Sequence, residues 1–145
     1  MRKILVSALA TLALAAGAYA QTPARLDANT ATKVELDAVP ELSDSQLQTI
    51  MTKRPFAGTS AYDAAVGVGL TAEQKTTLYA KVFVPIDLNK ASREEIMLIP
   101  GMTRRMAHEF EEYRPYASLA QFDKEIGKYV DAAEVARLRS YVVLK

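Results

Sequence analysis

The chain has 145 residues, half of them hydrophobic, and its 18 basic and 17 acidic side chains leave a net charge of +1. This length is sufficient for one ordinary domain or for two very small ones. The sequence contains no cysteine, which excludes disulfides and a cysteine-linked lipid anchor, and the near-zero net charge excludes the broad basic surface that many nucleic-acid-binding proteins carry.

The first 20 residues have the pattern of a secretory signal peptide. Arg2 and Lys3 form a positive start, residues 4–20 are apolar apart from small hydroxyl side chains, and Ala18-Tyr19-Ala20 has the small-x-small form of a cleavage site. The apolar stretch of about 17 residues is at the short limit for a membrane span. We expect residues 1–20 to be removed, residues 21–25 to form a linker, and the mature protein to be periplasmic or otherwise extracytoplasmic. Membrane attachment is expected only through an uncleaved signal sequence.

Residues 26–84 and 86–145 form an internal repeat with an offset of sixty positions. The offset aligns identical residues without an insertion: Asp27 with Asp87, Asn29 with Asn89, Pro40 with Pro100, Arg54-Pro55 with Arg114-Pro115, Gly67 with Gly127, and Leu78 with Leu138. We therefore expect two tandem domains of the same fold.

Removal of the signal peptide would take Arg2 and Lys3 with it. Without them, 16 basic residues remain against 17 acidic ones, a net charge of −1. We therefore expect no excess of positive charge on the mature protein.

Each repeat predicts four short helices. In the second repeat, apolar residues at helical spacing place the helices near 92–99, 104–114, 119–126 and 132–142, and the first repeat mirrors them. Most of these helices begin with a capping residue that has Glu or Gln three positions later, namely Thr32, Ser43, Thr71, Ser92 and Asp131. The terminal YVVLK is interpreted as a helix tail because its counterpart in the first repeat is YAKVF. The expected fold class is all-α, with about eight short helices in two tandem helix-hairpin-helix domains.

The turns between paired helices are candidate anion sites. Their sequences are Glu41-Leu42-Ser43, Gly69-Leu70-Thr71, Gly101-Met102-Thr103 and Tyr129-Val130-Asp131. A helix that begins at such a turn presents unpaired N–H groups and a partial positive charge, and a glycine lets a phosphate approach the backbone closely. Contacts of this kind go to the sugar-phosphate backbone, so they read shape instead of base sequence.

The segment 86–114, IDLNKASREEIMLIPGMTRRMAHEFEEYR, resembles the tandem helix-hairpin-helix domain of the ComEA-type competence proteins, the DNA receptors of bacterial natural transformation. The match includes Asn89, Ala91, Pro100-Gly101 and Tyr113-Arg114. The resemblance implies sequence-independent binding of double-stranded DNA in the cell envelope during DNA uptake. The family usually has two glycines in this turn, whereas this chain has Thr103 in place of the second.

The residues expected to bind DNA phosphates lie at the two turns that retain the first glycine. They are Gly101, Met102, Thr103, Arg104 and Arg105 at one turn, Gly69, Leu70, Thr71 and Lys75 at the other, and Lys90 and Arg93 as supporting residues. Glu41 and Asp131 place carboxylates in the remaining two turns, which therefore fit a phosphate poorly. Arg104 and Arg105 oppose the dipole of the helix that they begin, which favours an anionic partner.

The alternative is an interaction module of the cell envelope that does not bind DNA. Some secreted helix-hairpin-helix proteins of similar appearance, such as the extrinsic lumenal subunit of photosystem II, do not bind DNA. DNA-uptake or secretion proteins of the envelope are the expected protein partners. We expect no enzymatic activity, small-molecule substrate, cofactor or metal, because His108 is the only histidine and no zinc-ligand spacing or nucleophile motif occurs in the sequence.

Overall fold

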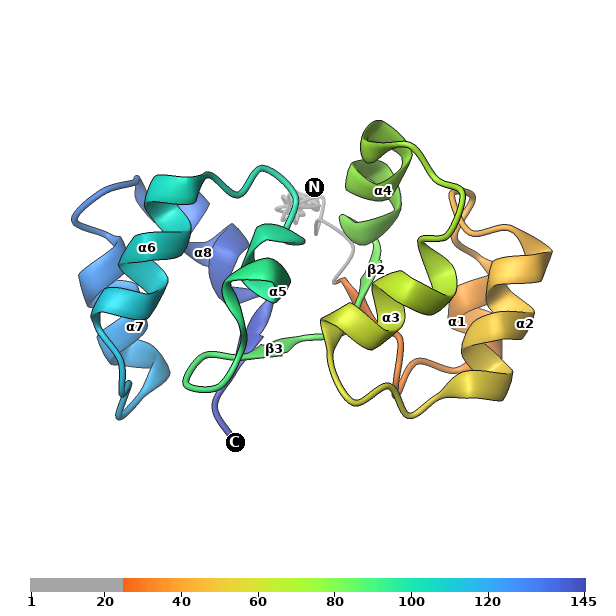
Figure 1. Ribbon diagram of the computed structural model, residues 1–145, viewed down its shortest axis with the longest axis horizontal. Coiled ribbons are helices and arrows are strands. Elements are labelled where there is room, and N and C mark those ends of the chain that lie inside the picture. Colours follow the sequence, from red (N-terminus) through yellow and green to blue (C-terminus); the bar gives the residue numbers. More distant parts are fainter. Residues whose placement is uncertain (1–24) are drawn as a thin grey trace, which may run out of the picture.

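The computed structural model describes residues 25–145, and the expected signal peptide, residues 1–20, lies outside this part of the chain. Figure 1 shows two four-helix halves, the first coloured orange to green and the second green to blue. The expected all-α class with eight short helices is confirmed. Within residues 25–145, every helix is too short or too polar to cross a membrane.

The two halves contain the same elements in the same order. The first half comprises β1 (Leu26–Asp27), α1 (Lys33–Asp37), α2 (Asp44–Lys53), α3 (Thr59–Val66), α4 (Ala72–Tyr79) and β2 (Val82–Phe83). The second half comprises β3 (Ile86–Asp87), α5 (Arg93–Met97), α6 (Arg104–Glu112), α7 (Leu119–Ile126), α8 (Ala132–Arg139) and β4 (Val142–Val143). In each half the two strands pair in parallel, β1 with β2 and β3 with β4, so each half brings its first and last residues together.

The expected helix tail at residues 141–145 is wrong. Helix α8 ends at Arg139, and Val142–Val143 forms β4 beside β3. The Ile86 amide donates to the Tyr141 carbonyl oxygen at 2.9 Å. β-Branched valines lose side-chain freedom in a helix, and the strand with which they pair lies at the other end of the repeat. The local sequence pattern therefore carried no sign of this pairing.

Reciprocal capping boxes are confirmed at four of the five expected positions. They are Thr32 with Glu35, Ser43 with Gln46, Thr71 with Gln74, and Ser92 with Glu95. Each box gives partners to two backbone amides at the start of a helix. The fifth box is incomplete, because Asp131 accepts from the Glu134 amide at 2.9 Å but the Glu134 carboxylate binds Arg137.

One asparagine in each half joins the start of the repeat to the loop after its second helix. The Asn29 side-chain amide donates to the Phe56 carbonyl oxygen at 3.1 Å and accepts from the Phe56 amide at 2.8 Å. Asn89 makes the same two bonds with Tyr116, at 3.0 and 2.7 Å. These side-chain amides are therefore occupied by the fold itself.

The arginines of the two Arg-Pro pairs have a matching structural role. Arg54 donates to the Ala31 carbonyl oxygen at 2.6 Å, and Arg114 donates to that of Ala91 at 2.8 Å. Two residues that carry the resemblance to competence proteins, Asn89 and Arg114, therefore stabilise the fold directly. Their presence specifies this architecture and does not by itself specify a ligand.

A line of aromatic rings connects the two halves into one core. Phe83, only 1% exposed, lies with its ring centroid 5.9 Å from that of Tyr79 and 5.0 Å from that of Tyr141 in the second half. Thr59, which is fully buried, donates its hydroxyl to the Val84 carbonyl oxygen at 2.7 Å in the segment between the halves. Helix α3 also contacts α5. The two halves therefore pack against each other and are not free to swing about their junction.

Arg25, the last residue of the expected linker, also bridges the halves. Its guanidinium lies 3.1 Å from the centroid of the Tyr141 ring and hydrogen-bonds the Ser140 hydroxyl, while its Nε donates to the Tyr79 carbonyl oxygen at 3.2 Å. Burial lowers the pKa of Arg25 to about 10, so the side chain remains charged at neutral pH. A cation over an aromatic face adds an attraction that packing alone does not supply.

Candidate nucleic-acid interface

Each half brings its two turns close together. In the second half, Arg137 of α8 donates to the Pro100 carbonyl oxygen at 2.7 Å, and the Arg105 guanidinium lies 6.0 Å from the centroid of the Tyr129 ring. In the first half, the turns that precede α2 and α4 line one common pocket. Each glycine turn therefore lies beside the other turn of its own half. In Figure 1, α4 and α6, which follow the two glycine turns, both begin at the upper edge of the view.

The turn before α6 requires its glycine. Gly101 has a φ of +75°, in the left-handed region that other residues rarely adopt. It is exposed, and a Cβ placed on it would lie 3.5 Å from the Arg137 guanidinium. Any side chain at this position would therefore strain the backbone, although its Cβ would lie in ordinary van der Waals contact with the arginine. The glycine leaves the start of α6 open to a large ligand.

Three consecutive amides at the start of α6 have no hydrogen-bond partner among the described residues. They belong to Thr103, Arg104 and Arg105. The Thr103 hydroxyl accepts from the Met106 amide at 3.1 Å, but Met106 has no oxygen to return to the Thr103 amide. Four other helices close this position with a Glu or Gln side chain. The sequence of α6 therefore leaves donors free at the exposed end of a helix dipole.

Arg104 and Arg105 are exposed, and neither has a carboxylate within ion-pair distance in residues 25–145. The supporting residues differ from them. Lys90 lies 3.4 Å from an Asp87 carboxylate oxygen, and Arg93 forms an ion pair with Glu111. The first turn of α6 contains no acidic residue, so two positive charges meet the positive end of the dipole there. This is electrostatically unfavourable unless an anion binds.

Arg137 is a further cation at this turn that sequence reasoning missed. Its Nε and Nη2 each donate to a Glu134 carboxylate oxygen at 2.7 Å, which orients the guanidinium beside Gly101. These hydrogen bonds raise the pKa of Arg137 and hold the pKa of Glu134 below its ordinary value. The sequence shows that Glu134 and Arg137 are three positions apart, but it does not show that they lie beside the turn before α6.

The Glu134 pair makes stability depend on pH. Because the pKa of Glu134 is lowered in the folded state, the pair contributes stability above the ordinary value of 4.5 and loses it as the pH falls through the folded value. Glu134→Gln, which keeps the shape of the side chain, is expected to melt at a lower temperature than the parent protein at about pH 7, and the difference should narrow as the pH falls below 4.5. Circular dichroism across this range measures the difference, and a gap that stays constant down to acid pH contradicts the prediction.

The turn before α8 places the Tyr129 ring near the start of α6, beside a second tyrosine. The Tyr113 and Tyr129 hydroxyls are 2.8 Å apart, and the hydrogen bond between them raises the pKa of Tyr129. The Lys128 ammonium lies 5.1 Å from the centroid of the Tyr113 ring and pairs with Glu125. Lys128 therefore adds positive charge near Arg105, although a carboxylate partly neutralises it.

The turn before α4 has the glycine but lacks free cations. Gly69 has a φ of +77° and nothing within 4 Å of a Cβ placed on it, so the turn is open. Lys75, expected to bind phosphate, is instead paired with Asp63 at 2.7 Å, and the Tyr79 hydroxyl donates to the same carboxylate oxygen at 2.5 Å. The Thr71 amide is also occupied, by the capping box with Gln74. The second half therefore carries most of the features that an anion site needs.

The two remaining expected residues lie under the turns. Leu70 and Met102 are half-buried and pack against the hydrophobic core. Their side chains anchor the turns, so any contact with a phosphate comes from the backbone on the other side. This burial agrees with a site at the start of α6 that is formed by backbone amides and by the Arg104 and Arg105 side chains.

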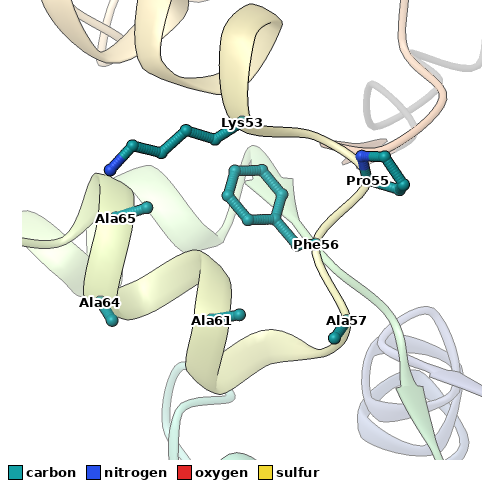
Figure 2. A pocket seen from close by; sticks show the side chains of 7 residues that line it. All are labelled: Lys53, Pro55, Phe56, Ala57, Ala61, Ala64 and Ala65. Carbon is teal, nitrogen blue, oxygen red and sulfur yellow. The ribbon is translucent and has the colours of Figure 1, made fainter.

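A shallow pocket on the first half has a different character. Figure 2 shows the Phe56 ring at its centre, Ala61 and Ala65 of α3 beside it, and the Lys53 side chain extended along its upper side. The lining of this pocket holds no carboxylate, histidine or hydroxyl group. Apart from the Lys53 amine, the lining side chains are therefore apolar.

Comparisons with protein-family models, with curated proteins and with solved structures find no match for this chain. The functional assignment therefore depends on the geometry and chemistry of the Gly101 turn.

Proposed function

We propose that this protein binds double-stranded DNA without catalysis and without sequence preference, through the start of α6. The observation that carries the proposal is the set of three free amides at Thr103, Arg104 and Arg105, with two unpaired guanidinium groups at the same place. A phosphate at this point would accept from the amides and neutralise the arginines. Such contacts involve only the backbone of DNA, so every sequence is bound alike.

The shape of the turn suits a polyanion better than a small anion. Gly101 is exposed and lies beside the Arg137 guanidinium, and Arg104 and Arg105 follow it at the start of α6, so several cations lie near one turn. A duplex presents a row of phosphates that can meet several of these groups together.

The cell envelope and DNA uptake are the proposed setting. The signal-peptide pattern of residues 1–20 supports export, and the resemblance of residues 86–114 to competence proteins supports a role in natural transformation. The protein would hold incoming duplex DNA outside the cytoplasm and pass it to envelope uptake proteins. Weak binding to the sugar-phosphate backbone suits this task, because the DNA must also be released.

Salt dependence tests the proposal directly. If Arg104 and Arg105, the two guanidinium groups without a carboxylate partner, neutralise two phosphates, the logarithm of the binding constant should fall with the logarithm of salt concentration with a slope of roughly −2. Fluorescence anisotropy with two labelled duplexes of unrelated sequence measures both the slope and the lack of preference. Absence of binding at low ionic strength, or a strong preference for one duplex, contradicts the proposal.

A protein-interaction module is the second candidate, and one observation favours it. The first half places Glu41 and Glu73 at its turns, in the region where the second half has Gly101 and its arginines. Carboxylates there repel DNA and suit a basic protein. Capture of an envelope protein that survives nuclease treatment, with no DNA binding by the purified chain, would favour this candidate over the first.

A further inference from the structure

The two turns of the first half enclose a small acidic pocket. Its volume is about 380 Å³, and it is lined by Glu41, Leu70, Glu73, Gln74, Thr77 and Leu78. Leu78 is buried and forms an apolar floor, whereas Glu41 and Glu73 are exposed. Neither carboxylate has an ion-pair partner in residues 25–145. The pocket therefore presents two uncompensated negative charges around an apolar base.

The second half shows what chemistry this position accommodates. The repeat offset of sixty places Thr77 at the position of Arg137, whose guanidinium reaches across to the opposite turn and donates to the Pro100 carbonyl oxygen at 2.7 Å. In the first half, Thr77 ends in a hydroxyl that bonds the Glu73 carbonyl oxygen at 3.0 Å and reaches no further. The space that the Arg137 guanidinium fills in the second half is therefore left as a pocket in the first half.

The lining of the pocket matches an arginine better than other side chains. Glu41 stands at the position of Gly101 and Glu73 at that of Ala133, whereas Gln74 stands at that of Glu134, so the first half has its carboxylates at two positions where the second has uncharged residues. A planar guanidinium can bind such carboxylates at two points while its aliphatic stem lies on leucine. A phosphate, by contrast, would meet repulsion.

We propose that this pocket binds an arginine side chain of a partner protein. The first half would then recognise a basic protein segment, while the equivalent turns of the second half face DNA. The inference goes beyond the proposed function and does not depend on it, because none of its residues belongs to the α6 site. Internal duplication would have allowed each copy to acquire a different ligand.

The test uses short capped peptides as probes and nuclear magnetic resonance of the mature chain as readout. Ac-Gly-Arg-Gly-NH₂ should shift the amide signals of residues 41, 70, 73, 74 and 77 saturably, and a peptide with citrulline in place of arginine should not. Glu41→Gln with Glu73→Gln should weaken binding by about fivefold for each carboxylate removed. Equal shifts with the citrulline peptide, or shifts confined to other residues, overturn the proposal.

A filling variant provides a second, independent test. Thr77→Arg supplies from within the chain the guanidinium that Arg137 supplies in the second half, so it should abolish peptide binding and leave DNA binding unchanged. Unchanged peptide binding by Thr77→Arg, with the fold intact by circular dichroism, overturns the assignment. Arg104→Glu with Arg105→Glu should have the opposite pattern, with peptide binding retained, which separates failure of this inference from failure of the DNA proposal.

Sedimentation equilibrium distinguishes a partner protein from a second copy of this chain, which offers Arg104 and Arg105 as exposed guanidinium groups. A monomer at all concentrations supports a separate partner. Self-association that disappears in Glu41→Gln with Glu73→Gln assigns the pocket to a second copy and overturns the proposal as stated.

Discussion

Arg104→Glu combined with Arg105→Glu is expected to weaken DNA binding strongly while making the folded protein more stable. The two arginines provide the unpaired cations at the start of α6, and glutamates there would repel phosphates from the free amides. Binding at low salt should weaken by about two orders of magnitude, and the salt slope should fall by about 2. Acidic residues in a first helical turn each contribute about 0.3–1 kcal/mol of favourable dipole interaction, so the melting temperature should rise.

The matched control reverses two exposed lysines of the first half. Lys33→Glu with Lys53→Glu changes the net charge by the same amount, but neither residue adjoins a glycine turn. Anisotropy with a labelled duplex should show near-parental affinity for this control, and thermal unfolding of both variants should verify that they fold. Equal loss of binding in the two double variants would mean that overall charge, and not the α6 site, holds the DNA.

Phe83→Ala is expected to cost about 3–5 kcal/mol of unfolding free energy, the usual range for removing a buried aromatic ring. The ring is 1% exposed and lies between Tyr79 of the first half and Tyr141 of the second. Its removal leaves a cavity at the point where the halves join, so both halves should lose protection from amide hydrogen exchange. Urea unfolding followed by circular dichroism measures the free energy.

The repeat itself supplies the control for this prediction. Val143 is the counterpart of Phe83 sixty positions later, and it is only partly buried, in β4 near the chain end. Val143→Ala should cost about 1 kcal/mol, close to the value of the methyl groups removed. If Phe83→Ala costs no more than Val143→Ala, the rings do not couple the halves and the shared core has no energetic role.

Helix positions, caps and turns followed from local pattern. Thr32, Ser43, Thr71 and Ser92 cap their helices as expected, because a short side chain and a Glu or Gln three residues later can meet only at a helix start. The sixty-residue offset also anticipated two halves with identical element order. The strands β1 to β4 were missed, since each is two residues long and pairs with a segment at the far end of its repeat.

Side-chain partnerships could not be anticipated in the same way. Lys75 looked like a phosphate ligand because it follows Gly69 in sequence, but folding places it against Asp63 of the preceding helix. Arg137 showed no sign of a role, yet packing of α8 against the turn before α6 places its guanidinium beside Gly101. In both cases the partner comes from another helix, and local spacing carries no information about such contacts.

The sequence alone determined the duplication, through identities sixty positions apart. It also determined the all-α class, the caps and the two glycine turns, because these depend on residues within about four positions of one another. Only the tertiary structure decided that the halves share a core, that α6 keeps three free amides beside three arginines, and that the first half carries an acidic pocket instead. Those features arise where segments distant in the chain meet, and the free energy of such contacts depends on packing that no local pattern encodes.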